Sequence, residues 1–145
     1  MNHQVRKFIM ESDLQPGDAI VAKKIGYRVL DHFIVYLGKE YSGHWFMANS
    51  MEEGVRQYSE DEVYELIKTF EPINIRKLQG NEHERELAIQ RALSQEGQPY
   101  SLFGSNCEHF ANYVQKEIKE SPQVGFWIFA ALTAAIVSIT SFGKR

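Results

Sequence analysis

The 145-residue chain has a single cysteine, Cys107, so it cannot form an internal disulfide. Neither C-x-x-C nor H-x-x-x-H spacing occurs, and one cysteine with scattered histidines is not the donor set of a zinc site, so we expect no metal and no cofactor. No run of lysine and arginine is interleaved with aromatic residues, and the formal net charge is −3, so a nucleic-acid partner is not expected. The first residues lack the apolar stretch of a signal peptide, which together with the lack of disulfides indicates a reducing compartment.

The composition fits one folded domain followed by a membrane anchor. With 43% hydrophobic and 24% charged residues, the chain is long enough for one compact core and too short for two. We expect a leader at residues 1–13 and the domain at residues 14–120. Residues 124–142 carry no charge, contain Trp127 and approach the roughly twenty apolar residues that cross a bilayer as a helix. This segment predicts a single transmembrane helix, although its threonines and serines leave a buried C-terminal helix as the alternative.

Local patterns predict an α+β fold in which a small antiparallel sheet packs on helices. Segments rich in β-branched and aromatic residues predict strands at residues 19–22, 29–37, 45–49, 55–58 and 73–78. Capping-box spacing occurs at residues 59–62 and 81–84, ahead of apolar positions with helical periodicity, so a helix is predicted at each site. Within the second strand, alternation places His32 on one face and Phe33 on the other, and both faces are largely apolar. We therefore expect this strand to be buried.

Cys107 lies at the predicted start of another helix. Phe110 and Val114 follow it at helical spacing, and Ser105 or Asn106 is a suitable N-cap residue. The thiol would then lie in the first helical turn, where free N–H groups and the helix dipole favour the thiolate, the reactive form of cysteine. A lone cysteine is also commonly a small buried apolar residue, and the spacing alone leaves this alternative open.

A cysteine nucleophile needs a base, and His32 is the best candidate. It lies inside a strand and is flanked by large apolar residues, so its ring would be held rigidly, although a structural core histidine is the alternative. His109 lies two residues from Cys107, a spacing that points the two side chains to different sides of a helix, so we expect it to support the site instead. His3 and His83 have weaker claims, because they lie in the leader and in the first turn of a polar helix.

Two residues compete for the third role, that of orienting the histidine ring. Asn49 lies on the strand that follows His32, and its amide oxygen can accept a hydrogen bond from an imidazole. His44 lies just before that strand, beside a loop glycine. We expect Asn49, because an orienting group works best on a rigid element.

Three segments, in this order, resemble the lecithin retinol acyltransferase-like family. They are Leu-Gln-Pro-Gly-Asp at residues 14–18, Asp-His-Phe-Ile-Val-Tyr-Leu-Gly at residues 31–38 and, most specifically, Asn-Cys-Glu-His-Phe at residues 106–110. The family includes small membrane-anchored phospholipase/acyltransferases, whose C-terminal anchor the chain also resembles. It is similar to a circularly permuted form of the NlpC-type, papain-like cysteine hydrolases. The resemblance covers residues 14–115 and implies a papain-like α+β domain.

The resemblance implies Cys107 as nucleophile and His32 as base, whereas many relatives have a histidine where this chain has Asn49. It implies an enzyme that attacks an acyl ester of a glycerophospholipid, forms an acyl thioester and passes the acyl group to water, a lysophospholipid or an amine. We therefore expect a phospholipid substrate and a membrane-anchored protein with its catalytic domain on the cytosolic side. The alternatives are a cysteine peptidase or deubiquitylase-type hydrolase on the same scaffold, and an inactive membrane-tethered adaptor.

Overall fold

The structure is a computed structural model that describes residues 1–24, 31–101 and 106–117 of the chain. Its helices are α1 His3–Glu11, α2 Glu60–Thr69, α3 Glu82–Ser94 and α4 Cys107–Lys116. Its strands are β1 Ala19–Lys24, β2 Asp31–Glu40, β3 Gly43–Ser50, β4 Gly54–Ser59 and β5 Phe70–Arg76. Every strand and helix expected from the sequence within these ranges overlaps one of these elements, with shifts of a few residues at the ends.

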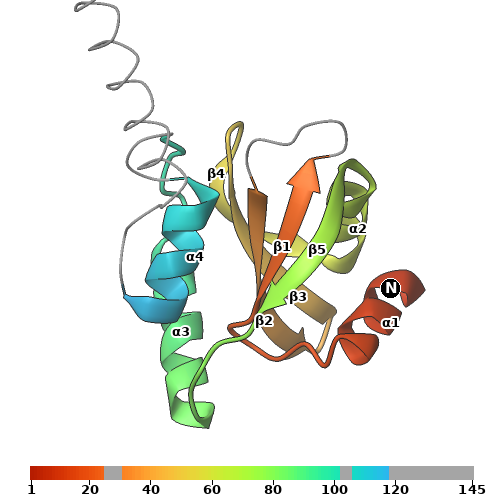
Figure 1. Cartoon of the computed structure of the whole chain (residues 1–145), viewed down its shortest axis with the longest axis horizontal. Helices are drawn as coiled ribbons and strands as arrows, with labels where there is room; N and C mark the ends of the chain where they lie inside the picture. The colour runs from red at the N-terminus through yellow and green to blue at the C-terminus, as the bar shows by residue number, and fades with distance from the viewer. Residues whose placement is uncertain (25–30, 102–105, 118–145) are drawn as a thin grey trace, which may run out of the picture.

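The five strands form one sheet in the order β4-β3-β2-β1-β5, and every neighbouring pair is antiparallel. Helices α3 and α4 cover one face of the sheet, and α1 and α2 lie against the other (Figure 1). The α+β class with a small antiparallel sheet packed on helices is therefore confirmed.

The transmembrane helix expected at residues 124–142 lies outside the described residues. Within the part of the chain that the structure describes, no helix has both the length and the apolar character that a bilayer crossing requires. The longest helix there, α3, has 13 residues, and five of them are charged: Glu82, Glu84, Arg85, Glu86 and Arg91.

Side chains alternate across the sheet as the strand pattern predicts. In β2, Phe33 and Val35 pack on the α3–α4 side, whereas Ile34 and Tyr36 pack on the α1–α2 side. The α3–α4 side also contains Val21, Met47, Val55, Ala88, Ala111 and Val114, and the α1–α2 side contains Val5, Ile9, Ile20, Phe46, Tyr58 and Val63. The alternation expected for β2 is thus confirmed, and it places His32 on the α1–α2 face.

Residues 3–11 form a helix that packs on the sheet, although the sequence shows no clear periodicity there and a leader was expected. Val5 and Ile9 lie four residues apart and are buried on the α1–α2 side of the core. The Arg6 side chain donates to the carboxylate of Glu60, which is 5% exposed, at 3.0 Å. A few apolar contacts and a partly buried ion pair hold this short helix in place, and neither feature makes a repeating pattern.

Strand β5 begins at Phe70, three residues before the strand expected from the sequence, and it includes Pro72. Proline lacks the N–H that a strand ladder uses, so within sheets it is confined mainly to edge strands and bulges. In the described sheet β5 is an edge strand, and the β1–β5 register shifts between Val21 and Ala22, the residue that pairs with Pro72. The chain therefore passes from α2 directly into the sheet, with Phe70 at the junction.

Asp18 ties together elements that lie far apart in the sequence. Its buried carboxylate accepts hydrogen bonds from the Leu78 N–H at 2.9 Å and from the Arg85 side chain at 3.0 Å, and it pairs with Lys77 at 3.2 Å. Burial acts to raise the pKa of Asp18, but hydrogen bonds from Leu78 and Gln15 and the two nearby cations outweigh burial and lower it. The charged form of Asp18 therefore stabilises the fold.

Replacing Asp18 with asparagine is expected to lower the free energy of unfolding at pH 7 by about 2 kcal/mol, because two cations lose a buried counter-charge. The folded-state pKa of Asp18 lies below its unfolded value of about 3.9. The contribution of the Asp18 carboxylate to the free energy of unfolding is therefore complete above that value, and it is lost as the pH falls through the folded-state pKa. Urea denaturation at several pH values measures both effects. Glu40→Gln, at an exposed position, is the control, and an equal loss in the two variants would contradict this role for Asp18.

Candidate active site

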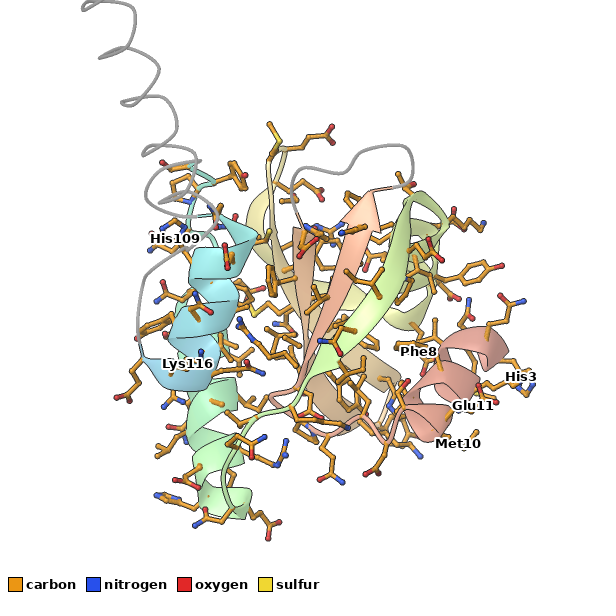
Figure 2. The ribbon with its side chains drawn as sticks, viewed as in Figure 1. His3, Phe8, Met10, Glu11, His109 and Lys116 are labelled. Atoms are coloured by element: carbon orange, nitrogen blue, oxygen red, sulfur yellow. The ribbon has the colours of Figure 1, made fainter. Side chains whose placement is uncertain are left out.

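Helix α4 begins at Cys107, and Asn106 is its N-cap residue. The Asn106 Oδ1 accepts hydrogen bonds from the N–H groups of Glu108 and His109, both at 3.0 Å. The Asn106 N–H in turn donates to the His109 Nδ1 at 3.4 Å, which completes a capping box. His109 lies at the upper end of α4 in Figure 2, where it fixes the first turn of the helix that carries the cysteine.

At the start of β2, one edge is not paired by any strand that the structure describes. Residues 31–35 pair with β1, whereas pairing with β3 begins only at Ile34. The N–H and C=O of Tyr36 form hydrogen bonds with the segment that leads into β1. Backbone groups alternate between the two edges of a strand, so in this part of β2 those of even-numbered residues point toward β1 and those of odd-numbered residues toward β3. The backbone groups of Asp31 and Phe33 therefore point to this edge, which we call the open edge of β2.

The Cys107 thiol forms hydrogen bonds with the backbone at the open edge. It donates to the Asp31 carbonyl oxygen, 3.5 Å from the sulfur, and the Phe33 N–H donates to the sulfur. Asp31 and Phe33 flank His32 in the sequence. The sulfur thus lies beside the backbone of the candidate base, and the structure places the cysteine and the histidine at the same end of the sheet.

The His32 ring lies on the α1–α2 face and extends over β1 toward β5. It is stacked on the Phe70 ring, with the centroids 4.7 Å apart and 27° between the planes. Burial lowers the pKa of His32 to about 4, so the imidazole is neutral at pH 7. Among the hydrogen bonds of the described residues, none joins this ring to the Cys107 thiol. The thiol lies on the α3–α4 face of the sheet, and the ring lies on the α1–α2 face.

Asn49 is fully buried on β3, at the same end of the sheet as Cys107. Its partner on β4 is Val55, and its neighbour Ala48 belongs to the last β2–β3 pair. Val55 packs on the α3–α4 side of the core. By this register Asn49 shares the face of Cys107, whereas the His32 ring lies on the other face.

His44, the other candidate for the third role, lies at the opposite end of the sheet. It pairs with Lys39, seven positions along β2 from His32, which corresponds to about 23 Å. The ring Nδ1 shares a hydrogen bond with the Tyr36 hydroxyl at 2.6 Å, and the His44 N–H donates to Glu60 at 2.9 Å. The structure therefore brings Asn49, and not His44, to the end of the sheet that holds Cys107.

Cys107, His32 and Asn49 all line one cavity of about 750 Å³. Phe70 and Tyr100 line it as well, and neither stands out in the sequence. Tyr100 lies in the extended segment that leads toward Cys107. Phe70 comes beside His32 because β2 and β5 pair with opposite edges of β1, a long-range arrangement that leaves no signal in local spacing.

Burial decides the charge of the thiol. It raises the pKa of Cys107 to about 11, and the Glu108 carboxylate adds to this rise, whereas N–H groups of Phe33 and of the first helical turn act against it. The prediction that the helix N-terminus ionises Cys107 is therefore wrong for this structure. The cost of burying the thiolate charge exceeds its stabilisation by the N–H groups. At pH 7 the site therefore holds a neutral thiol and a neutral imidazole.

The family model described as lecithin retinol acyltransferase matches residues 12–119, which is most of the chain. The matched range contains all five strands, helices α2 to α4 and the three motif segments, together with Cys107, His32 and Asn49. A search of curated proteins finds no match. The resemblance carried by the motifs is confirmed, and the chain belongs to the lecithin retinol acyltransferase family.

Proposed function

We propose that the chain is a thiol-dependent phospholipid acyl hydrolase and acyltransferase of the phospholipase A/acyltransferase branch. Membership of the family indicates an acyl-transferring, lipid-modifying activity. The finer proposal depends on one observation, the position of the Cys107 sulfur between the backbone groups that flank His32. Acyl transfer requires a nucleophile and a base. Cys107 and His32 both line a cavity that is large enough for part of a lipid.

In the proposed reaction, the neutral His32 imidazole takes the thiol proton as the Cys107 sulfur attacks the ester carbonyl carbon. The tetrahedral intermediate collapses with cleavage of the carbon–oxygen bond, and the imidazolium gives its proton to the departing lysophospholipid oxygen. The acyl group is then held as a thioester on Cys107. Water, a lysophospholipid or an amine attacks the thioester while His32 removes the proton of the acceptor. That proton returns to the sulfur when the thioester breaks.

The protonation states of the resting site support this order of steps. Burial raises the pKa of Cys107 and lowers the pKa of His32, so the two groups form no ion pair before the substrate arrives. The proton then moves only as the carbon–sulfur bond forms. In the proposal, the imidazole turns toward the open edge of β2. The backbone of His32 already lies at this edge.

We propose Asn49 as the third residue of the site, and Asn49→Ala is expected to lower turnover by at least about tenfold. This substitution removes an amide that is buried beside the reacting groups. His44→Ala is the matched control and should change turnover by about twofold or less, because His44 lies on β3 beside the far end of β2. Steady-state hydrolysis of a phospholipid ester measures both variants. A near-normal rate in Asn49→Ala with a collapse in His44→Ala would assign the third role to His44.

The architecture is compatible with the papain-like, permuted NlpC-type fold that the resemblance implies, since a cysteine begins a helix and the candidate base lies on an adjacent strand. We further propose that residues 124–142 tether the enzyme to a membrane, with the catalytic domain on the cytosolic side. Tethering suits a phospholipid substrate, because the ester already lies in the bilayer and the search for it is confined to a surface.

Activity on mixed phospholipid vesicles, compared with activity on peptide and isopeptide substrates, tests the proposed function. Release of fatty acid and lysophospholipid from the vesicles, without cleavage of peptides, is the expected result. Cleavage of a peptide or isopeptide bond in place of the ester would instead assign a cysteine peptidase or a deubiquitylase-type hydrolase.

One observation favours a second candidate, an inactive membrane-tethered adaptor. Burial raises the pKa of the Cys107 thiol, and a raised pKa in an apolar setting is typical of an unreactive cysteine. The two candidates differ in one measurable property, because only the enzyme forms an acyl thioester on Cys107 during incubation with phospholipid.

A further inference from the structure

The His32 ring is held by a ring from another strand. Phe70 follows α2 and begins β5, and its ring stacks on the imidazole at a centroid distance of 4.7 Å. In the sheet, β1 lies between β2 and β5, so the two backbones are about 10 Å apart. Ala22 of β1 pairs with His32 and carries only a methyl group, which leaves room for the two rings to meet over β1.

Stacking constrains an imidazole differently from a hydrogen bond. Both ring nitrogens lie in the plane of the ring, so a partner on the face fixes that plane and leaves the nitrogens available for proton transfer. Phe70 also lines the cavity that His32 and Cys107 line, so it forms an apolar wall next to the base. A base that is held in one plane reaches the reacting proton with less loss of freedom.

We propose that Phe70 is the positioning residue for His32, fixing the plane of the imidazole from which the ring moves toward the open edge of β2 and keeping water from its face. This inference rests on the proposed function, in which His32 is the base. Asn49 lies on the opposite face of the sheet, which it shares with Cys107.

Charged and titratable groups on several elements line the same cavity and influence any pH measurement. The carboxylates are Asp31 on β2, Glu52 and Glu53 at the β3–β4 turn, Glu62 and Glu65 on α2, and Glu108 on α4. The other such groups among the described residues, besides His32 itself, are Arg56, Tyr58, Tyr100 and Cys107. A control must therefore disturb the cavity without touching the stack. Leu66 on α2 lines the cavity as well, so Leu66→Val is that control.

The experiment is an NMR titration of the histidine ring protons in the full chain, with His32→Asn used to assign the His32 signal. In the unmodified chain we expect His32 to titrate near pH 4, with ring protons shifted upfield by the Phe70 ring. Phe70→Leu should raise the pKa of His32 by about one unit or more, because water then reaches the imidazole and favours its charged form. Phe70→Tyr, which keeps the ring, and Leu66→Val should leave this pKa nearly unchanged.

Turnover on phospholipid vesicles gives the second readout. Phe70→Leu should lower kcat by about tenfold, with a smaller change in KM, and Phe70→Tyr should restore it. An unchanged His32 titration in Phe70→Leu, or an equal shift in Leu66→Val, would overturn the positioning role. So would a wild-type His32 that titrates with the exposed histidines, a result that needs no folded variant. Lack of phospholipid turnover in the wild type would overturn the proposed function separately, since the titration does not depend on activity.

Discussion

Cys107→Ala is expected to abolish phospholipid hydrolysis and acyl transfer, with a loss of about a thousandfold or more. The proposed reaction runs through a covalent thioester, and the sulfur that forms it is the only one from a cysteine in the chain. Alanine removes this single atom from the first turn of α4 and leaves the Asn106 cap, which holds the helix start, in place. Fatty-acid release from vesicles measures the loss.

The fold of this variant must be checked separately, because Cys107 is buried and contacts the backbone of β2. Thermal unfolding and the His32 titration provide this control, and both should remain close to those of the unmodified chain. Retention of more than about a tenth of the activity in a pure, folded Cys107→Ala sample would contradict the assignment of the nucleophile.

His32→Asn is expected to cause the second-largest loss, of about a hundredfold to ten-thousandfold in turnover, which is the usual range for removal of a general base. In the unmodified chain, turnover should fall as the pH drops through about 4, because the protonated imidazole cannot accept the thiol proton. This acid limb should be absent from the residual activity of the variant. His83→Asn replaces an exposed histidine on α3 and is the matched control, with near-normal turnover.

The same residue links pH to stability. The folded-state pKa of His32 lies below its unfolded value, so the unfolded chain binds a proton first as the pH falls from about 6.5 toward 4. The free energy of unfolding should therefore decrease over that range in the unmodified chain and decrease less in His32→Asn. An identical pH dependence in the two proteins would show that His32 is not buried as a neutral ring.

The sequence predicts those elements that local chemistry decides. The strand of His32 is recognisable because β-branched and aromatic residues alternate across two apolar faces, and the sheet buries both. Helix α2 starts where Ser59 and Glu62 satisfy each other's backbone N–H groups, and α3 starts in the same way at Asn81. The candidate nucleophile Cys107 and the candidate base His32 could be proposed for the same reason, since each lies within a recognisable local element.

Features that depend on distant parts of the chain could not be predicted in this way. The docking of α1 requires Arg6 to meet Glu60, and the plane of the His32 ring depends on Phe70 across β1. The charge of the Cys107 thiol depends on how deeply the folded chain buries it. The position at a helix N-terminus alone predicts a lowered pKa for this thiol, whereas burial raises the pKa. Which of Asn49 and His44 lies at the end of the sheet that holds Cys107 depends on the pairing of β3 with β2 and with β4, which local sequence does not reveal.

Intact-protein mass spectrometry of samples quenched in acid during turnover shows whether a phospholipid acylates Cys107. We expect an added mass of one acyl group, mapped to the peptide that contains Cys107, removed by hydroxylamine and absent from Cys107→Ala. Turnover of phospholipid by a chain that stays unmodified, or that carries the acyl group on another residue, would show that Cys107 is not the nucleophile.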